Sequence, residues 1–476
     1  MLFNSFEFLI FFPVVTILYY ALPYKFRWIL LLAASCVFYM FFVPVYILIL
    51  LTTILIDYFA AIWIDKSEGK RKRIYLIISI GSTCLVLFIF KYFNFFNENF
   101  RLLAQLIHWN YPIQALKILL PIGLSFHTFQ SLSYVIEVYR GNQKPEYHFG
   151  IYSLYVMFYP QLSAGPIERP QNMLHQFYEE HDFDYDNVMY GLKRMLWGYF
   201  KKVVIADRLS LYVNAVYGDQ RAHNGTSLLL ATIFFTFQIY CDFSGYSDIA
   251  IGCARVMGFK LMTNFNRPMF SRSMTEYWRR WHISLSTWFN DYLFTPLVFE
   301  FRNAGKFAVV FALLITFFVS GLWHGAGWTF IAWGLLHGVA ITYEFLTKKK
   351  RKRLFQYVPE LVSKTMCFLL TFGFVSFTLI FFRAVNFSEA LTIIHKIMFE
   401  PGRLFIGGNM WLIVYSVFFI LVLLLTELIQ EYKLFNNFSL IYNPNKAVRY
   451  LTYYSLVLII LLLGVFDSSQ FIYFQF

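Results

Sequence analysis

The stretch WILLLAASCVFYMFFVPVYILILLTTILI, residues Trp28–Ile56, decides the fold class because it carries no charged side chain. Crossing the hydrocarbon core of a bilayer takes about 20 apolar residues in a helix, so this stretch is too long for one crossing. Proline interrupts a helix because it lacks a backbone N–H and clashes with the preceding turn. Pro44 is therefore the expected break, and the stretch predicts two membrane-spanning helices.

The same pattern recurs along the chain. Only 14% of its 476 residues are charged and 59% are hydrophobic, whereas soluble domains carry about 25% charged residues. We predict an all-α polytopic membrane protein with 11–12 transmembrane helices, plus amphipathic or re-entrant helices. The other charge-free runs are Phe8–Tyr24, Ile74–Phe90, Ile118–Ile136, Phe149–Ile167, Ala222–Cys241, Phe307–Trp323, Gly325–Tyr343, Thr365–Phe382, Leu404–Thr426 and Tyr450–Phe466.

The net charge of +13 predicts the orientation. Short loops rich in Lys and Arg stay on the cytoplasmic side of a membrane. The clusters Lys66–Arg73 and Thr347–Arg353 are the densest, and placing the first inside puts Tyr24–Arg27 inside and the N-terminus outside. The segment Asp186–Ser210 breaks this alternation, and its separated basic and apolar faces predict an amphipathic helix at an interface, or a re-entrant piece.

We expect one membrane domain over residues 1–476, with function concentrated in the middle. Residues 1–115 and roughly 400–476 are hydrophobic helices with few polar groups, and we assign 1–115 and 346–476 to N- and C-terminal transmembrane helices. Residues 119–345 hold many polar and aromatic side chains between apolar runs. Polar groups inside a membrane are costly and mark pathways or sites. The block 119–345 is therefore the predicted catalytic core.

The densest polar segment is Ser271–Leu297, where charged side chains alternate with aromatic ones. Arginine binds phosphate through two parallel hydrogen bonds, and indole rings can stack on a purine. The segment therefore suits a nucleotide-bearing ligand, although an interfacial aromatic belt with snorkelling arginines explains the composition equally well. The candidate phosphate and base contacts are Arg272, Arg279, Arg280 and Trp281.

A second polar segment, Gln238–Gly252, ends an apolar run with Asp242 and Asp248. Residues six apart do not share a face of a regular helix, and the glycine and serines between them suggest a turn or a broken helix. Helix capping by Asp242 or a serine is an equally good explanation.

Two histidines, His324 and His337, lie in the otherwise apolar stretch SGLWHGAGWTFIAWGLLHG. A membrane-embedded histidine is a base, a proton relay, a ligand or a hydrogen-bonded structural group. Glycines beside His324 permit close approach of a ligand or backbone, while nothing favours a functional role for His337. No other metal ligand lies at helical spacing from His324, so we expect no metal.

Seven motifs occur in order along the chain: PIGLSFHTFQSLSYVIEVYRG, FYPQLSAGPIERP, QIYCDFSGYSDIAIG, FNRPMFSRS, YWRRWHISLSTWFNDYL, SGLWHGAGWTFIAWGLLHG and FFRA. Together they resemble the membrane-bound O-acyltransferase (MBOAT) family, and most closely its bacterial branch typified by the membrane subunit of alginate O-acetyltransferase. One departure follows the PL of TPL, where Val298–Arg302 replaces the Gly-Gly-Asn-Arg-like turn common in that branch.

The resemblance implies a ring of tilted helices around a thin core, where a cytosolic and an outer funnel meet near His324, the family's base. It implies a protein of the bacterial cytoplasmic membrane that passes an acetyl group from cytosolic acetyl-CoA to the outer side. There an SGNH-type periplasmic partner or an exported polysaccharide would accept it, with membrane lipids but no nucleic acid as partners. The expected supporting residues are Tyr240, Asp242, His282, Asn290 and Trp323.

The chemistry agrees with this assignment. Acyl transfer from a thioester to a hydroxyl needs a base, dipoles for the oxyanion and exclusion of water, and apolar surroundings would keep His324 neutral and basic. No permanently bound cofactor is expected. Three alternatives remain open at this point: transfer of another acyl group such as D-alanine from a carrier protein, transport of a lipid-linked intermediate, and a non-catalytic scaffold.

Overall fold

The computed structural model describes residues 1–433, 443–466 and 472. The chain is 77% helical, and no strand occurs among the described residues, which confirms the predicted all-α class. It divides into two compact units, residues 1–192 with 250–262, and residues 193–249 with 263–476. The predicted division at residues 115, 119 and 345 stays a prediction, and its last block includes residues outside the described ranges.

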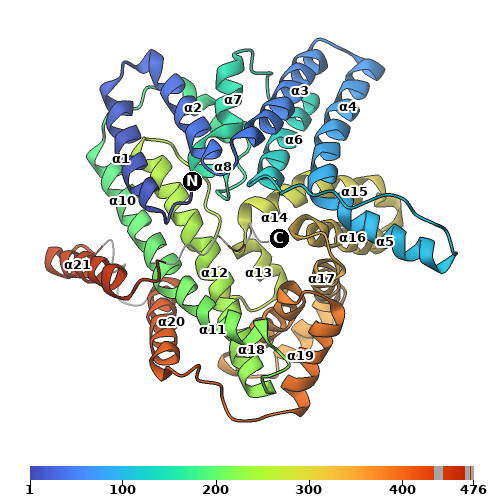
Figure 1. Cartoon of the computed structure of the whole chain (residues 1–476), viewed down its shortest axis with the longest axis vertical. Coiled ribbons are helices and arrows are strands. Elements are labelled where there is room, and N and C mark those ends of the chain that lie inside the picture. Colours follow the sequence, from blue (N-terminus) through green and yellow to red (C-terminus); the bar gives the residue numbers. More distant parts are fainter. Residues whose placement is uncertain (434–442, 467–471, 473–476) are drawn as a thin grey trace. The chain divides into compact units, whose positions relative to one another are not determined.

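The first unit holds the N-terminal helices (Figure 1). Their bounds are α1 Phe6–Ala21, α2 Tyr24–Met40, α3 Ile47–Asp65, α4 Gly69–Leu87, α5 Phe93–Leu106, α6 Leu124–Arg140, α7 Phe149–Met157, α8 Tyr159–Leu162 and α9 Pro170–Met173. Helices α10 (Tyr185–Tyr199) and α12 (Gly225–Val256) each contain the boundary between the units.

The second unit holds the remaining helices. Their bounds are α11 Asp207–Gly218, α13 Met274–Arg280, α14 Ile283–Phe289, α15 Thr295–Glu300, α16 Lys306–His324, α17 Trp328–Phe355, α18 Glu360–Arg383, α19 Phe387–Phe399, α20 Met410–Glu431 and α21 Lys446–Leu463.

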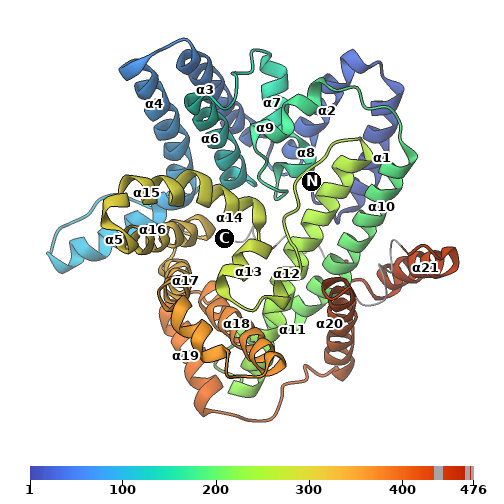
Figure 2. The same ribbon diagram turned by 180° about the vertical axis from the view of Figure 1, so that it is seen from behind.

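In the first unit, α3, α4 and α6 lie side by side in both views (Figures 1 and 2). The buried carboxylate of Asp57 on α3 accepts hydrogen bonds from Ser79 (2.6 Å) and Thr83 (3.1 Å) on α4. A buried polar group costs little once it is hydrogen-bonded, so these bonds let a carboxyl group remain between the helices. The break expected at Pro44 is present, because a short 3₁₀ turn begins there and separates α2 from α3.

In the second unit, α16 packs against α17, and α17 packs against α18 (Figure 2). Helix α12 is largely buried, since 83% of the residues in its most apolar 18-residue stretch are buried. An amphipathic stripe is enough for a surface helix, but α12 faces protein on most sides. Its polar side chains must therefore find partners within the protein.

Eight helices of the described chain are long and apolar enough to cross a membrane, and α1 is a shorter apolar helix. The predicted number was 11–12. The run Trp28–Ile56 yields only one such helix, because α2 has 17 residues, and Ile118–Ile136 contributes to the 17-residue α6. In the run Phe149–Ile167, helix α7 already ends at Met157. Charge-free length therefore overestimated helix length.

Candidate active site

The junction of α16 and α17 places His324 at the last residue of α16. Two glycines allow the helices to approach closely here. A Cβ at Gly321 would lie 2.4 Å from the carbonyl oxygen of Phe330, and one at Gly334 would lie 2.2 Å from that of Phe317. Any larger side chain would push the helices apart, so these glycines fix the position of His324 against α17.

Aromatic rings surround the His324 imidazole, which is 2% exposed. The ring centroids of Trp323, Trp333 and Phe382 lie 4.9, 4.8 and 5.5 Å from its own, with interplanar angles of 68–85°. These side chains come from α16, α17 and α18. They separate the imidazole ring from bulk water.

Trp333 has a further property beside His324. Its side chain is 5% exposed, and its indole Nε1–H has no hydrogen-bond acceptor among the described residues. Leaving a buried donor unsatisfied costs about 1–3 kcal/mol. A donor held in this state next to a histidine suits a substrate oxygen as its acceptor.

A cavity of about 470 Å³ lies between α13, α14, α16 and α17. Arg279 and Asn290 are exposed at its edge, whereas Thr316 and Ser320 are buried in its wall. The Thr316 hydroxyl has no hydrogen-bond partner among the described residues. Ser320 lies one helical turn before His324. The volume is typical of a small-molecule site, so the cavity offers a ligand space within a turn of the histidine.

His282, the second predicted polar residue of the centre, is fully buried between α13 and α14. Its φ of +44° is unusual for a residue other than glycine. Asn264 Oδ1 lies 3.2 Å from its Nδ1 and accepts from the Ser284 hydroxyl at 2.9 Å. Because Asn264 Oδ1 can only accept, Nδ1 carries the proton. Burial lowers the pKa of His282 to about 3, so the ring is neutral at physiological pH.

Trp323 connects the two histidines. Its ring centroid lies 6.0 Å from that of His282 and 4.9 Å from that of His324. The structure therefore brings together His324, His282 and Trp323 of the predicted centre. Asn290 lies at the cavity edge instead.

Both ring nitrogens of His337 are hydrogen-bonded. Trp278 Nε1 donates to its Nδ1 at 3.2 Å, and its Nε2 lies 3.0 Å from the Thr378 hydroxyl. Since Nδ1 accepts, Nε2 carries the proton and donates to Thr378. These contacts tie α17 to α13 and α18, as expected of a structural histidine.

The segment Gln238–Gly252 corrects one prediction. Instead of a turn or broken helix, α12 runs through it without interruption. Gly245 is a contact point rather than a break, because a Cβ there would lie 2.8 Å from the carbonyl oxygen of Gly198. The small residue lets α12 pass close to the C-terminal half of α10.

Asp242 and Asp248 are both ion-paired. Lys202 Nζ lies 2.7 Å from Asp242 and 2.8 Å from Asp207, while Lys201 Nζ lies 2.5 Å from Asp248. The two lysines follow α10 in a π-helical segment and are 4% and 2% exposed. Of the two alternatives predicted for Asp186–Ser210, an interfacial amphipathic helix or a re-entrant piece, the interfacial helix does not fit these two buried lysines. The two carboxylates raise the pKa of Lys202, although burial alone would lower it.

The four residues predicted to contact the phosphates and base of a nucleotide differ in whether their side chains are already bound by other residues. Arg280 is held by Glu276 (2.7 Å) and Glu431 (2.8 Å), and Arg272 donates to the Tyr432 hydroxyl at 3.2 Å. Trp281 is buried and stacks on Tyr277 at 5.5 Å. Arg279 alone of the four lines the cavity.

Tyr240, another predicted supporting residue, donates its hydroxyl hydrogen to Glu427 of α20.

Glu427 and Glu431 were not identified from the sequence. Two carboxyl groups four residues apart near the end of an apolar run face the same side of a helix, and this was the available signal. Trp333, Phe382 and Thr316 carried no signal, because aromatic and hydroxyl residues are common throughout the apolar runs.

Comparison with known proteins decides the family. The family model described as "MBOAT, membrane-bound O-acyltransferase family" matches residues 146–356. The peptidoglycan O-acetyltransferase of Helicobacter pylori is 34% identical over 392 residues, which cover 76% of this chain and 72% of that protein. The chain belongs to the MBOAT family. It is therefore a multi-pass membrane acyltransferase, as the resemblance predicted.

Other relatives are named for acetyl or for D-alanyl transfer. A probable alginate O-acetylase of Pseudomonas aeruginosa is 36% identical over 406 residues, covering 84% of this chain and 75% of that protein. A teichoic acid D-alanyltransferase of Streptococcus thermophilus is 31% identical over 245 residues, covering 49% and 59%. The residues around His324 and those of the cavity fall within the MBOAT match, except Phe382 of α18. Glu427 and Glu431 lie beyond it.

Proposed function

We propose that this MBOAT protein is an O-acetyltransferase of the bacterial cytoplasmic membrane, with its N-terminus outside. It takes the acetyl group of cytosolic acetyl-CoA and delivers it to a hydroxyl on the outer side. The acceptor is an exported polysaccharide, reached directly or through an SGNH-type periplasmic partner. Relatives named for peptidoglycan and alginate acetylation support an acetyl group and a polysaccharide acceptor.

One observation carries the proposal: His324 is enclosed by aromatic rings one helical turn from a cavity that has an exposed arginine at its edge. A thioester needs a dry site and a neutral base. The cavity suits the pantetheine arm, with Arg279 meeting a phosphate group at the edge and the Thr316 hydroxyl bonding an amide inside.

In the proposed reaction, the neutral imidazole of His324 removes the proton from the acceptor hydroxyl as its oxygen attacks the thioester carbonyl. Trp333 Nε1–H donates to the oxyanion that forms. The C–S bond then breaks, which leaves the acetyl group as an ester on the acceptor oxygen. The imidazolium gives its proton to the departing CoA sulfur. His282 and Trp323 orient the base and do not exchange protons.

The relative that transfers D-alanine supports a second candidate, in which the donor is an aminoacyl carrier protein. Purified protein in sealed proteoliposomes distinguishes the two. Labelled acetyl-CoA and a D-alanine-loaded carrier protein are supplied in turn on one face, with a hydroxyl acceptor on the other. We expect transfer from acetyl-CoA alone, and Arg279→Gln to raise its KM about tenfold through loss of a charge-assisted phosphate contact. Transfer from the carrier protein alone would overturn the acetyl assignment.

A further inference from the structure

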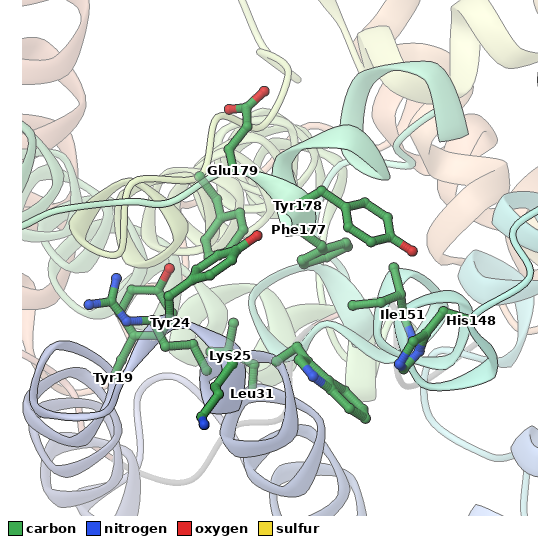
Figure 3. A pocket seen from close by; sticks show the side chains of 12 residues that line it. Tyr19, Tyr24, Lys25, Leu31, His148, Ile151, Phe177, Tyr178 and Glu179 are labelled. Atoms are coloured by element: carbon green, nitrogen blue, oxygen red, sulfur yellow. The ribbon is translucent and has the colours of Figure 1, made fainter.

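The first unit contains a cavity of about 200 Å³ that the acyl-transfer chemistry does not use. It lies where α1 ends, α2 begins and α7 begins. Figure 3 shows Tyr19, Tyr24 and Lys25 on one side of it and His148 and Ile151 on the other. Its wall also includes Arg27, Trp28, Leu31, Phe177, Tyr178, Glu179 and Phe259.

Arg27 makes this cavity unusual. The residue is only 9% exposed, yet it forms no ion pair with any described residue. Its guanidinium donates to the carbonyl oxygens of Leu22 (3.1 Å) and His181 (2.7 Å) and lies over the rings of Tyr19 and Tyr20, at 5.0 and 5.9 Å. A buried charge is costly unless it is compensated. Carbonyl oxygens and rings compensate it only in part, so a cavity beside a guanidinium with no carboxylate partner favours an anionic ligand.

Other groups around the cavity add donors rather than acceptors. Lys25 supplies a second positive charge at the rim, where its ammonium lies 5.0 Å over the ring of Phe26. Ile151 N donates to His148 Nδ1 at 3.2 Å, so a neutral His148 carries its proton on Nε2 and can still donate. The carboxylate of Glu179 points away from Lys25 and Tyr24 in Figure 3 and lies 3.7 Å from His175. The lining therefore has net positive charge and free donors.

The surroundings favour a lipid over a soluble anion. Helix α1 leads into the cavity through Tyr19, and its outward side chains Phe6, Ile10 and Ile17 are 73%, 55% and 68% exposed. Exposed apolar residues on a helix of a membrane protein face acyl chains. The cavity is also smaller than the 300–1,000 Å³ or so that small-molecule sites usually offer, while a phosphodiester headgroup needs less room.

We infer that this cavity binds the phosphodiester headgroup of a membrane phospholipid, with its phosphate at Arg27 and Lys25 and its acyl chains along α1. Basic pockets between transmembrane helices on the cytoplasmic side are sites for anionic headgroups, and the positive-inside prediction places Tyr24–Arg27 there. The aromatic side chains Tyr19, Tyr24 and Trp28 suit the interface between water and hydrocarbon. This inference is independent of the acyl donor and acceptor.

The direct test uses the wild-type protein in nanodiscs of phosphatidylcholine and phosphatidylglycerol. Electron cryomicroscopy is expected to show a headgroup phosphate within hydrogen-bonding distance of Arg27, with chain density along α1. A cavity that holds only water overturns the inference. This arm needs no variant and does not depend on transferase activity.

Variants give the second test, with native mass spectrometry measuring bound phosphatidylglycerol. Arg27→Gln, which keeps hydrogen-bond donors but loses the charge, is expected to bind about tenfold more weakly, and Arg27→Lys to bind nearly as well as wild type. Lys70→Ala removes a basic residue of the first unit that does not line the cavity and is the matched control. Thermal unfolding verifies that each variant is folded.

Two outcomes of this test contradict the inference. Equal binding by wild type and a folded Arg27→Gln variant would show that the charge has no ligand. Displacement of the lipid by excess inorganic phosphate, or binding of phosphate without lipid, would identify a soluble anion as the occupant. Retention of the lipid in excess phosphate supports the inference.

Discussion

Two histidines of one motif, His324 and His337, are equally buried but have different surroundings. His337 is fixed by hydrogen bonds from Trp278 and to Thr378. His324 lies among three aromatic rings, beside an indole N–H with no acceptor in the described chain and one turn from a cavity. Burial alone therefore does not identify a catalytic histidine. The contrast lies in whether the neighbouring polar groups are already satisfied.

The largest expected effect follows from substituting the histidine near the cavity. His324→Gln removes the base but keeps a polar side chain, and we expect kcat to fall by about 10³-fold or more, within the upper range of general-base contributions. Steady-state transfer from labelled acetyl-CoA measures it, with size-exclusion profiles verifying the fold. A variant with the kcat of the wild type would show that His324 is no more catalytic than His337.

Substituting a buried polar residue that is already hydrogen-bonded or ion-paired should instead have a large effect on stability. Lys202→Met leaves Asp207 and Asp242 buried without their shared cation, and breaking a buried pair costs about 3–5 kcal/mol. We expect a clear drop in thermal stability in detergent. Combining it with Asp207→Asn and Asp242→Asn should restore much of the loss, whereas no recovery would indicate that packing rather than charge explains the drop.

Trp333→Phe tests whether the unsatisfied indole N–H acts on the oxyanion. The ring remains but the donor is lost, and we expect kcat to fall about 10²-fold with KM little changed, as for removal of one oxyanion donor. Initial rates over a range of acetyl-CoA concentrations separate the two parameters. An increase in KM at constant kcat would instead assign Trp333 to ground-state binding.

His337→Leu is the counterpart of the His324 variant. It leaves the Trp278 indole N–H without its acceptor, which costs about 1–3 kcal/mol for a buried donor, while the Thr378 hydroxyl keeps its bond to the Val375 carbonyl oxygen. We expect a lower melting temperature and a kcat close to wild type for the folded protein. Loss of activity as complete as in the His324 variant would contradict the structural role.

A further prediction concerns the pH dependence of stability. Burial lowers the pKa of His282 to about 3 from the ordinary value of 6.5, so below pH 6.5 the unfolded chain binds a proton that the folded chain excludes. Stability is full above pH 6.5 and falls toward pH 3 by up to about 1.4 kcal/mol per pH unit from this residue. Melting temperatures measured over this range should fall less steeply in His282→Asn, and equal slopes would contradict the assignment.

The sequence was sufficient for the helical class, the family, the break at Pro44 and the placement of His324 among apolar residues. These depend on local pattern and on motifs. It failed at Gly245, where a residue that disfavours helices in isolation sits inside α12 because Gly198 packs against it. Tertiary contacts override propensity at such crossings.

Partners distant in the sequence were equally hidden. Lys201 and Lys202 lie in a segment with the spacing of an interfacial helix or a re-entrant piece. They nevertheless pair with Asp248 and Asp242 of α12, 47 and 40 residues further along. Arg280 had the character of a phosphate ligand, but Glu431 of α20 holds it. Helical periodicity indicates which face of a helix a residue occupies. It does not indicate which other segment packs against that face.

The most direct test of the proposed chemistry is a single-turnover assay with labelled acetyl-CoA and purified, detergent-solubilised protein, comparing wild type with His324→Ala. The wild-type protein should release labelled acetate or transfer it to a hydroxyl acceptor, while the folded variant should leave the thioester intact. Substantial acetyl transfer by the variant would contradict the assignment of His324 as the base.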